Sequence, residues 1–181
     1  VAAWQRRDGS ILWVSENCRA ERDQAGRTRY YDGSVEDITE RKQAEEERDR
    51  FFTLSLDLMC IASTDGFFQR LNPAFERTLG YTTEEMLKRP FMDFIHPDDV
   101  AATQAVVATL AGGVELVNFE NRYRCKDGSY RWLLWTSAPA GGLIYATARD
   151  ITERKQDEQM RQQLSAIVES AEDAVLGKSL E

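Results

Sequence analysis

The sequence predicts an α+β fold built around an antiparallel sheet, and three observations support this. Two strand-like runs are followed by several short helical segments, one longer helix and then three further strand-like runs. Tight-turn signals such as Asp65-Gly66 and Asp127-Gly128 join neighbouring runs, which is typical of antiparallel hairpins. A seven-residue motif also occurs twice, each time between a strand-like run and a charged helical stretch.

The repeated motif is Asp-Ile-Thr-Glu-Arg-Lys-Gln, found at residues 37–43 and again at residues 150–156. The copies begin 113 residues apart, about the size of one small domain, so an internal repeat is the first interpretation to test. We interpret each copy as a joint between a folded unit and a connecting helix.

Composition excludes several classes of function. The hydrophobic content of 42% and the charged content of 30% are ordinary for a globular protein. The net charge of −8 argues against a nucleic-acid or anionic-membrane surface, because phosphates require clustered Lys and Arg. Since the chain has no run of about 18 apolar residues, we expect a cytoplasmic segment without direct membrane contact, even where its parent protein is membrane-anchored.

The residue types that carry chemistry are scarce. Cys18, Cys60 and Cys125 lack the CxxC spacing, so we expect free thiols in a reducing compartment. The single histidine, His96, leaves little material for a structural zinc site or a Ser-His-Asp triad. No nucleophile with an adjacent base and no phosphate-binding glycine loop is present, so we expect no metal site and no catalytic residue in this fragment.

The first part of the chain predicts a hairpin followed by a helix. Turn signals at Asp8-Gly9 and at residues 23–26 bound the apolar run of residues 11–14 and a second strand through Val35. We expect no third strand before this hairpin. Residues 37–56 contain no Gly or Pro and predict a solvated linker helix with an apolar side only near Phe51 and Leu54.

The central part predicts two strands and then four helical segments. Residues 58–62 and 67–71 are apolar runs on either side of the turn at residues 64–66. Asn72 and Pro73 predict an N-cap and the first position of a short helix that ends at Gly80. Short helical segments follow near residues 82–87 and 91–95, and Pro97 starts the longest helix of the domain, which Gly112-Gly113 ends.

The last part predicts three strands and an exit helix. From Val117 to Cys125 apolar and polar residues alternate, with Val117 and Phe119 on the same face as Asn121. Residues 132–135 are apolar at four successive positions, so we expect this strand to be covered on both faces. Residues 143–148 form the last strand before the second joint, and Met160, Leu164, Ile167 and Ala171 follow the spacing of a coiled-coil seam.

Distinctive motifs lie at the short helices, the hairpin and the second joint. They are Asn72-Pro73-Ala74-Phe75, Leu79-Gly80-Tyr81-Thr82, His96-Pro97-Asp98-Asp99, residues 124–132 and residues 149–155. With these motifs in this order of elements, the chain resembles a PAS (Per-Arnt-Sim) sensory domain with its C-terminal PAC motif, over residues from about 51 to 156. The resemblance implies a five-stranded antiparallel sheet with short helices on one face, between N- and C-terminal signalling helices.

The resemblance also implies a division of the chain. Residues 1–36 are similar to the C-terminal strands of a truncated preceding PAS domain, and residues 37–56 form the linker helix. Residues 57–150 make one complete PAS domain, residues 151–172 the exit helix and residues 173–181 the start of a following PAS domain. The chain is therefore expected to be one module of a tandem array in a bacterial signalling protein. Its parent would be a two-component sensor histidine kinase or a cyclic-di-GMP enzyme, either a diguanylate cyclase or a phosphodiesterase.

What the resemblance implies for function is signal sensing or relay, and two interpretations of the interior stay open. Inward side chains could fill the core, with Asn121 bonded to backbone, so that the module is a closed spacer and dimerisation unit. Alternatively they line a pocket for a small-molecule ligand. The candidate pocket residues are Ile61, Phe91, Phe94, Phe119, Asn121, Tyr123, Leu133, Trp135 and Ile144.

Haem and flavin are both disfavoured as cofactors. Flavin-binding relatives carry an Asn-Cys-Arg-Phe-Leu-Gln stretch before the long helix, whereas Asn17-Cys18-Arg19 lies in a strand-like region far upstream. No histidine follows Asp99, so the long helix offers no haem ligand, and His96 is interpreted as a helix-start residue. We expect the purified protein to show no visible absorption band.

The second joint is the candidate signalling site. We expect Asp150 to bond back to the Trp132 indole or to Arg131, and Thr152 to cap the exit helix. Strain in the sheet would then change the angle or register of that helix. A homodimer is expected through the flanking helices and through the outer sheet face around Trp132 and Leu134.

Overall fold

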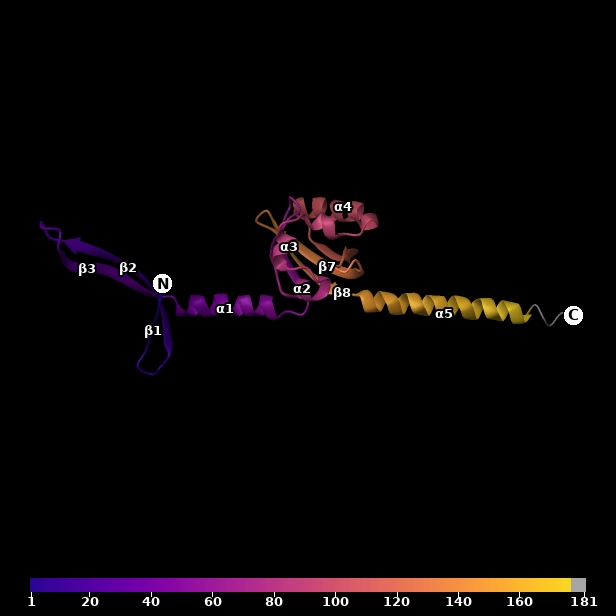
Figure 1. Ribbon diagram of the computed structural model, residues 1–181, viewed down its shortest axis with the longest axis horizontal. Coiled ribbons are helices and arrows are strands. Elements are labelled where there is room, and N and C mark those ends of the chain that lie inside the picture. Colours follow the sequence, from indigo (N-terminus) through magenta and orange to yellow (C-terminus); the bar gives the residue numbers. More distant parts are fainter. Residues whose placement is uncertain (177–181) are drawn as a thin grey trace. The chain divides into compact units, whose positions relative to one another are not determined.

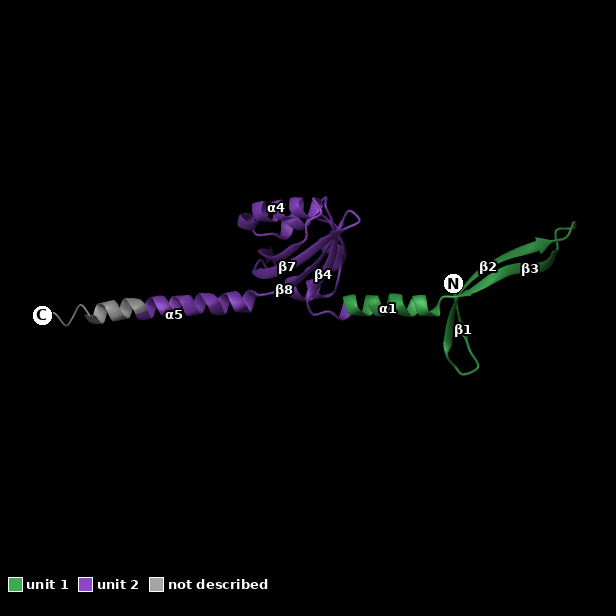
Figure 2. Ribbon diagram, turned by 180° about the vertical axis from the view of Figure 1, so that it is seen from behind, with its two compact units in different colours: residues 1–52 green, residues 53–181 purple. Residues whose placement is uncertain are grey.

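The structure is a computed structural model that describes the backbone of residues 1–176 and the side chains of residues 1–168. It divides into two compact units, Val1–Phe52 and the chain from Thr53 onward, which are described separately below (Figure 2). Residues 173–181, the predicted start of a following domain, lie outside the fully described residues. Within residues 1–176 no helix is both long enough and apolar enough to cross a membrane.

Unit 1 is a three-stranded antiparallel sheet followed by a helix. The strands β1 (Ala2–Gln5), β2 (Ile11–Arg22) and β3 (Thr28–Asp37) lie in the order β1-β2-β3, and α1 (Thr39–Leu54) follows. The expectation of a hairpin without a third strand was wrong, because β1 pairs with residues 11–14 across the Asp8-Gly9 turn. Ala-Ala-Trp-Gln has no alternating pattern, so only its pairing partner shows that it is a strand.

Unit 2 contains the predicted five-stranded antiparallel sheet (Figure 1). Its strands lie in the order β5-β4-β8-β7-β6, so that β5 and β6 form the two edges. The hairpin turns fall where they were predicted, at Gly66 and at Gly128, both with positive φ. The strand bounds are β4 (Leu58–Ser63), β5 (Phe68–Leu71), β6 (Leu116–Arg124), β7 (Tyr130–Ala140) and β8 (Leu143–Asp150).

Short helices connect β5 to β6. They are α2 (Ala74–Leu79), α3 (Thr83–Leu87), the 3-10 helices η1 (Phe91–Phe94) and η2 (Pro97–Asp99), and α4 (Val100–Ala111). Gly80 ends α2 with a left-handed φ of 79°, and Thr82 caps α3 in a capping box with Glu85. Asn72 does not cap α2 as predicted. Its side chain accepts from the Met59 N–H and donates to the Asp57 carbonyl, which fixes the start of β4.

The core lies between the helices and one face of the sheet. Phe75 and Leu79 of α2, Met86 of α3 and Leu110 of α4 are buried against inward-facing strand residues such as Leu133. The Phe68 ring contacts the Phe75 ring edge-on, and the helices between β5 and β6 pack against this inner face of the sheet.

β6 departs from the predicted alternation at its start. Asn118 adopts a φ of 60°, and the pairing of β6 with β7 shifts register between Val117 and Phe119. This bulge turns Val117 outward, where it is 63% exposed, and places Leu116 on the inner face beside Phe119. From Asn121 to Tyr123 the alternation follows the prediction.

The exit helix α5 begins at Thr152 and continues to Leu176. It starts directly after β8, and its first turn contacts the outer face of β6 and β7. Ile151 and Thr152 are both buried at this start.

Candidate functional site

A cavity lies between α4 and the inner face of the sheet in unit 2. Its volume is about 60 Å³, and its walls combine residues from all five strands of the sheet with one side of α4. Most of the lining side chains are apolar, and none carries a formal charge. The lining residues are Cys60, Ala62, Phe68, Phe91, Thr103, Val106, Val107, Leu110, Leu116, Phe119, Asn121, Tyr123, Trp135, Ser137, Ile144 and Ala146.

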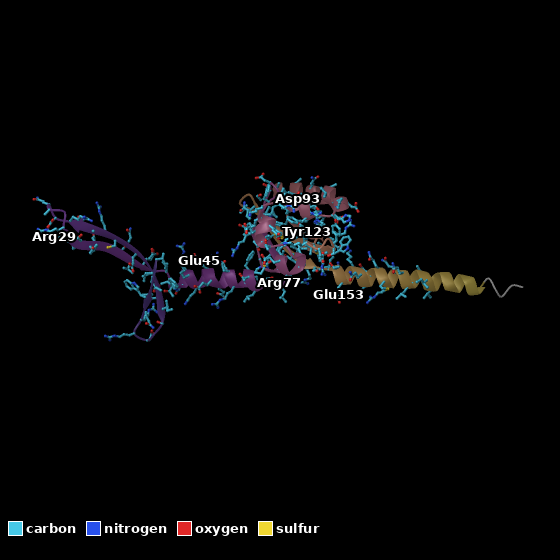
Figure 3. All side chains as sticks on the ribbon, viewed as in Figure 1. Arg29, Glu45, Arg77, Asp93, Tyr123 and Glu153 are labelled. Carbon is cyan, nitrogen blue, oxygen red and sulfur yellow. The ribbon has the colours of Figure 1, made fainter. Side chains whose placement is uncertain are left out.

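Six of the nine predicted pocket residues line this cavity. One of them is the buried Tyr123, which is labelled within unit 2 in Figure 3. Ile61 does not, because β4 alternates with Leu58, Cys60 and Ala62 buried and Ile61 on the other face. Phe94 is buried beneath Tyr81, with ring centroids 5.0 Å apart. Leu133 is fully buried in the core but is not part of the cavity wall.

The sequence-based interpretation missed the contribution of α4. Thr103, Val106, Val107 and Leu110 all face the cavity. Their spacing of three, one and three residues is the pattern of one helix face, so the signal was present in the sequence. Cys60 and Ala62 were missed for another reason: all five residues of the run 58–62 are apolar, so the pattern did not say which face is buried.

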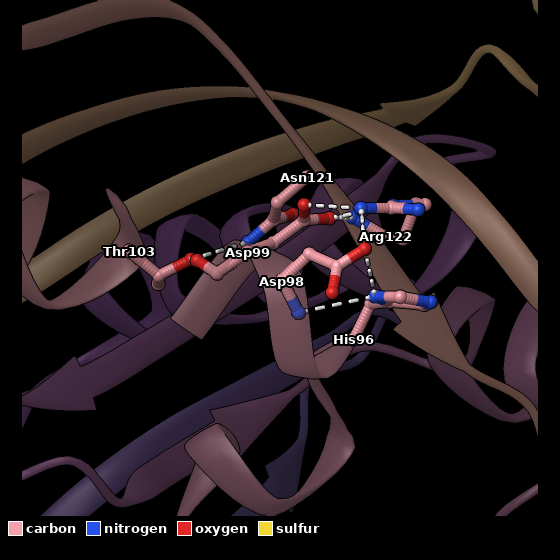
Figure 4. A network of polar contacts seen from close by, with 6 residues as sticks. All are labelled: His96, Asp98, Asp99, Thr103, Asn121 and Arg122. Atoms are coloured by element: carbon pink, nitrogen blue, oxygen red, sulfur yellow. Dashed lines mark hydrogen bonds and ion pairs between the residues drawn. The ribbon is translucent and has the colours of Figure 1, made fainter. Parts of the chain in front are cut away.

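Asn121 is the centre of a buried polar network at the cavity wall (Figure 4). Its side-chain oxygen accepts from the Trp135 indole N–H at 2.8 Å, and its amide nitrogen donates to the Thr103 hydroxyl at 3.1 Å. Thr103 in turn donates to the Asp99 carbonyl at 2.8 Å. The partners of Asn121 are thus side chains on β7 and α4, where the closed-core interpretation expected backbone.

Asp99 and Arg122 connect the start of α4 to β6 (Figure 4). The Asp99 carboxylate accepts from the Arg122 backbone N–H at 2.8 Å and from its guanidinium at 2.6 and 2.9 Å. The hydrogen bond from Arg122 holds the pKa of the Asp99 carboxyl below its usual value. Since the His96 N–H also donates to the Arg122 carbonyl, the segment before α4 covers the open edge of β6.

Trp132, Asp150 and Thr152 meet at the second joint. The Thr152 hydroxyl accepts from the Trp132 backbone N–H at 2.9 Å, and the Ile151 N–H donates to the Trp132 carbonyl. Asp150 accepts from the Thr152 N–H at 2.8 Å and lies 3.5 Å from the Arg131 guanidinium. Of the two partners foreseen for Asp150, the structure places Arg131 beside it.

The outer face of the sheet is covered at the same place. Lys155 of α5 and Arg122 of β6 both lie over the Trp132 ring, 5.2 and 5.1 Å from its centroid. Glu120 forms ion pairs with Arg154 at 2.7 Å and with Lys155 at 2.6 Å. We expected the strand at residues 132–135 to be covered on both faces. At Trp132 the outer face is covered by the first turn of α5 together with Arg122.

The first joint repeats these contacts in unit 1. The Thr39 hydroxyl accepts from the Trp13 N–H at 2.9 Å, and Asp37 accepts from the Thr39 N–H at 2.9 Å. The Ile38 N–H donates to the Trp13 carbonyl, as Ile151 does to Trp132. The two copies of the seven-residue motif thus form the same local structure.

These features together define the fold of unit 2. A sheet in the order β5-β4-β8-β7-β6, helices on one face and a cavity between them are the architecture of the PAS fold. Residues 69–142 match the family model described as "PAS fold". Unit 2 of this chain therefore has the PAS fold.

Known relatives include signalling proteins. The chain is 29% identical over 123 residues to the probable diguanylate cyclase DgcE of Escherichia coli (strain K12), covering 64% of the chain and 11% of that protein. It is 28% identical over 127 residues to the sensor histidine kinase TmoS of Ectopseudomonas mendocina, covering 65% of the chain and 13% of that protein. The chain thus spans a small part of each relative.

A solved structure gives the same result. The PAS domain of an HTR-like protein from Haloarcula marismortui is 26% identical, with a TM-score of 0.52. The match covers 62% of this chain and 98% of that domain.

Proposed function

We propose that unit 2 is a signal-relay module, in which a ligand- or partner-induced change in the PAS domain passes through the flanking helices to a downstream output domain. The carrying observation is the position of three consecutive residues on β6. Asn121 lies at the cavity wall. On the other face of the sheet, Glu120 contacts the exit helix and Arg122 contacts the Trp132 ring. A shift of β6 therefore acts on the cavity and on the start of α5 at once.

The joint completes the proposed route. Trp132 accepts and donates backbone hydrogen bonds at the start of α5, and Asp150 and Thr152 hold the first turn in place. Because β7 also carries Trp135, the indole partner of Asn121, the same strand contacts both the buried network and the joint. Signal transfer then takes the form of a change in the angle or register of α5.

The parent protein that we propose is a histidine kinase, with a cyclic-di-GMP enzyme as the alternative, and this fragment itself performs no catalysis. The similarity to TmoS and to DgcE supports both choices of parent. The duplicated joint supports a tandem array with a preceding PAS domain that ends at unit 1. Neither haem nor flavin is proposed, since a cavity of about 60 Å³ has room for roughly four to six water-sized groups.

The test uses Asp150→Ala in the full-length parent protein. We expect the output activity, kinase or cyclase, to lose its response to the input while the purified protein keeps its fold by circular dichroism. Asp127→Ala is a matched control, since Asp127 accepts from Ser129 in the same way within the β6–β7 hairpin and forms no hydrogen bond or ion pair with the described side chains of α5. An unchanged response in Asp150→Ala would contradict the relay.

A second candidate function is a closed spacer and dimerisation module. The observation that favours it is the exposure of the seam on α5, where Met160, Leu164 and Ile167 are 57%, 55% and 62% exposed. A second copy of the chain would cover this seam in a homodimer, with the outer sheet face around Trp132 and Leu134 as a further contact. Thermal stabilisation by any compound of a metabolite library would separate a ligand-binding module from a closed spacer.

A further inference from the structure

We propose that the cavity of unit 2 binds a small, uncharged and mainly apolar molecule that carries one or two hydrogen-bonding atoms. This inference rests on the sensory function proposed above and specifies the chemical class of its ligand. Charge, polarity and size of the cavity each support it.

The first argument is charge. No Asp, Glu, Lys or Arg side chain lines the cavity. The nearest charged pair described above, Asp99 with Arg122, is already joined by three hydrogen bonds at the edge of β6. An anionic or cationic ligand would therefore be buried without a counter-ion, which is strongly unfavourable.

The titratable groups of the cavity keep it neutral as well. Burial raises the pKa of the Cys60 thiol to about 12, and burial raises the pKa of the Tyr123 phenol above its usual range. Both groups therefore stay protonated at neutral pH. They offer a ligand no negative charge with which a buried cation could pair.

The second argument concerns hydrogen bonding. Asn121 forms hydrogen bonds with both Trp135 and Thr103, so these three side chains already have partners within the protein. Among the residues that the structure describes, the hydroxyls of Ser137 and Tyr123 in the cavity wall have no hydrogen-bond partner in the protein, and because no fully buried polar side-chain atom is unpaired there, both hydroxyl oxygens keep some accessible surface. A ligand with one or two polar atoms would satisfy these hydroxyls.

The third argument is size. A cavity of about 60 Å³ has room for roughly four to six water-sized groups. The walls around this space are aromatic and aliphatic, with Phe68, Phe91 and Phe119 among them. The ligand is thus a short alcohol, ketone or comparable neutral molecule.

The test is a charge series of nearly equal size: 1-pentanol, butyrate and butylammonium, each titrated into the 15N-labelled chain and followed by amide NMR shifts. We expect saturable shifts with pentanol at residues of the cavity wall, and binding weaker by about tenfold or more for both ions. Equal binding of butyrate or butylammonium would overturn the inference, and so would the absence of pentanol binding.

Two variants locate the binding. Ala146→Leu fills the cavity from β8 and should abolish pentanol binding, whereas Thr147→Leu, on the exposed face of the same strand, should leave it unchanged. Ala62→Val fills the cavity by a smaller amount and serves if Ala146→Leu does not fold. Pentanol shifts that persist in the cavity-filling variant would contradict the assignment. If pentanol binds in the cavity but the output domain of the full-length parent does not respond, the proposed signal relay is wrong while the ligand class inferred here stands.

Discussion

The Thr152 hydroxyl accepts a hydrogen bond from the Trp132 backbone N–H at 2.9 Å, which joins the first turn of α5 to strand β7. Thr152 is buried, so this N–H has little access to water as a replacement partner. The bond also occurs between Thr39 and Trp13 at the same distance in unit 1. A threonine at the same position of each motif copy thus links the helix to a strand of its sheet.

Thr152→Val keeps the shape of the side chain but removes the acceptor. We expect unit 2 to lose about 1–2 kcal/mol of unfolding free energy, because the Trp132 N–H is left unpaired. Urea denaturation followed by circular dichroism measures this loss. Thr147→Val, at an exposed position of β8, should change stability little; equal losses in both variants would contradict the role of the hydroxyl.

Asn121→Leu tests the buried network. The variant leaves the Trp135 indole N–H unpaired and removes the amide that donates to the Thr103 hydroxyl, which keeps its bond to the Asp99 carbonyl, so we expect a loss of about 2–3 kcal/mol. Combining it with Thr103→Val in a double-mutant cycle should give strongly non-additive losses, since the two residues share one hydrogen bond. Additive losses would show that Asn121 and Thr103 act independently.

Asp99 gives unit 2 a dependence on pH. Its pKa is depressed in the folded state by Arg122, so its contribution to stability is present above the unfolded value of about 3.9 and is lost as the pH falls below it. Between about pH 5 and pH 2, the unfolding free energy of Asp99→Asn should fall less steeply than that of the wild type. Asp65→Asn, at an exposed turn, is the control and should follow the wild-type curve.

Glu120→Gln removes both ion pairs to the start of α5. We expect faster hydrogen exchange in the first turn of α5 at low salt, with little change in global stability, because such partly exposed pairs contribute modestly. At about 1 M salt the two proteins should exchange alike, since screening already weakens these pairs in the wild type. Glu115→Gln, at an exposed position before β6, should show no difference at either salt concentration.

Leu164→Glu tests the proposed dimer. Placing a charge in the apolar seam of α5 should shift sedimentation from dimer toward monomer. Gln162→Glu introduces the same charge on the opposite side of the helix and should leave the oligomeric state unchanged. A monomeric wild-type chain would refute the dimer directly.

The turns and the order of elements could be predicted from the sequence because they depend on local residues. Gly66, Gly80 and Gly128 occupy positions with positive φ, where glycine has no steric penalty. Thr82 and Glu85 form the capping box that their spacing indicates. In such places a few neighbouring residues determine the backbone.

Features that depend on distant partners could not be predicted. Asn72 has the sequence of a helix cap, but its amide fits between Met59 and Asp57, which lie 13 and 15 residues away. The bulge at Asn118 turns the Val117 side chain to the outer face, although apolar and polar residues alternate regularly along this stretch of the sequence. Ile61 was assigned to the pocket because a uniformly apolar strand does not reveal its buried face.

The two tryptophans of unit 2 lie at opposite ends of the proposed route. Trp135 donates to Asn121 beside the cavity, whereas Trp132 lies beneath the Lys155 ammonium group at the start of α5. Indole emission is sensitive to both hydrogen bonding and nearby charge, so the domain carries an optical reporter for each event. Ligand uptake should alter the Trp135 signal first, and release of the helix the Trp132 signal. The order of those two changes after rapid mixing would give the direction in which the signal travels.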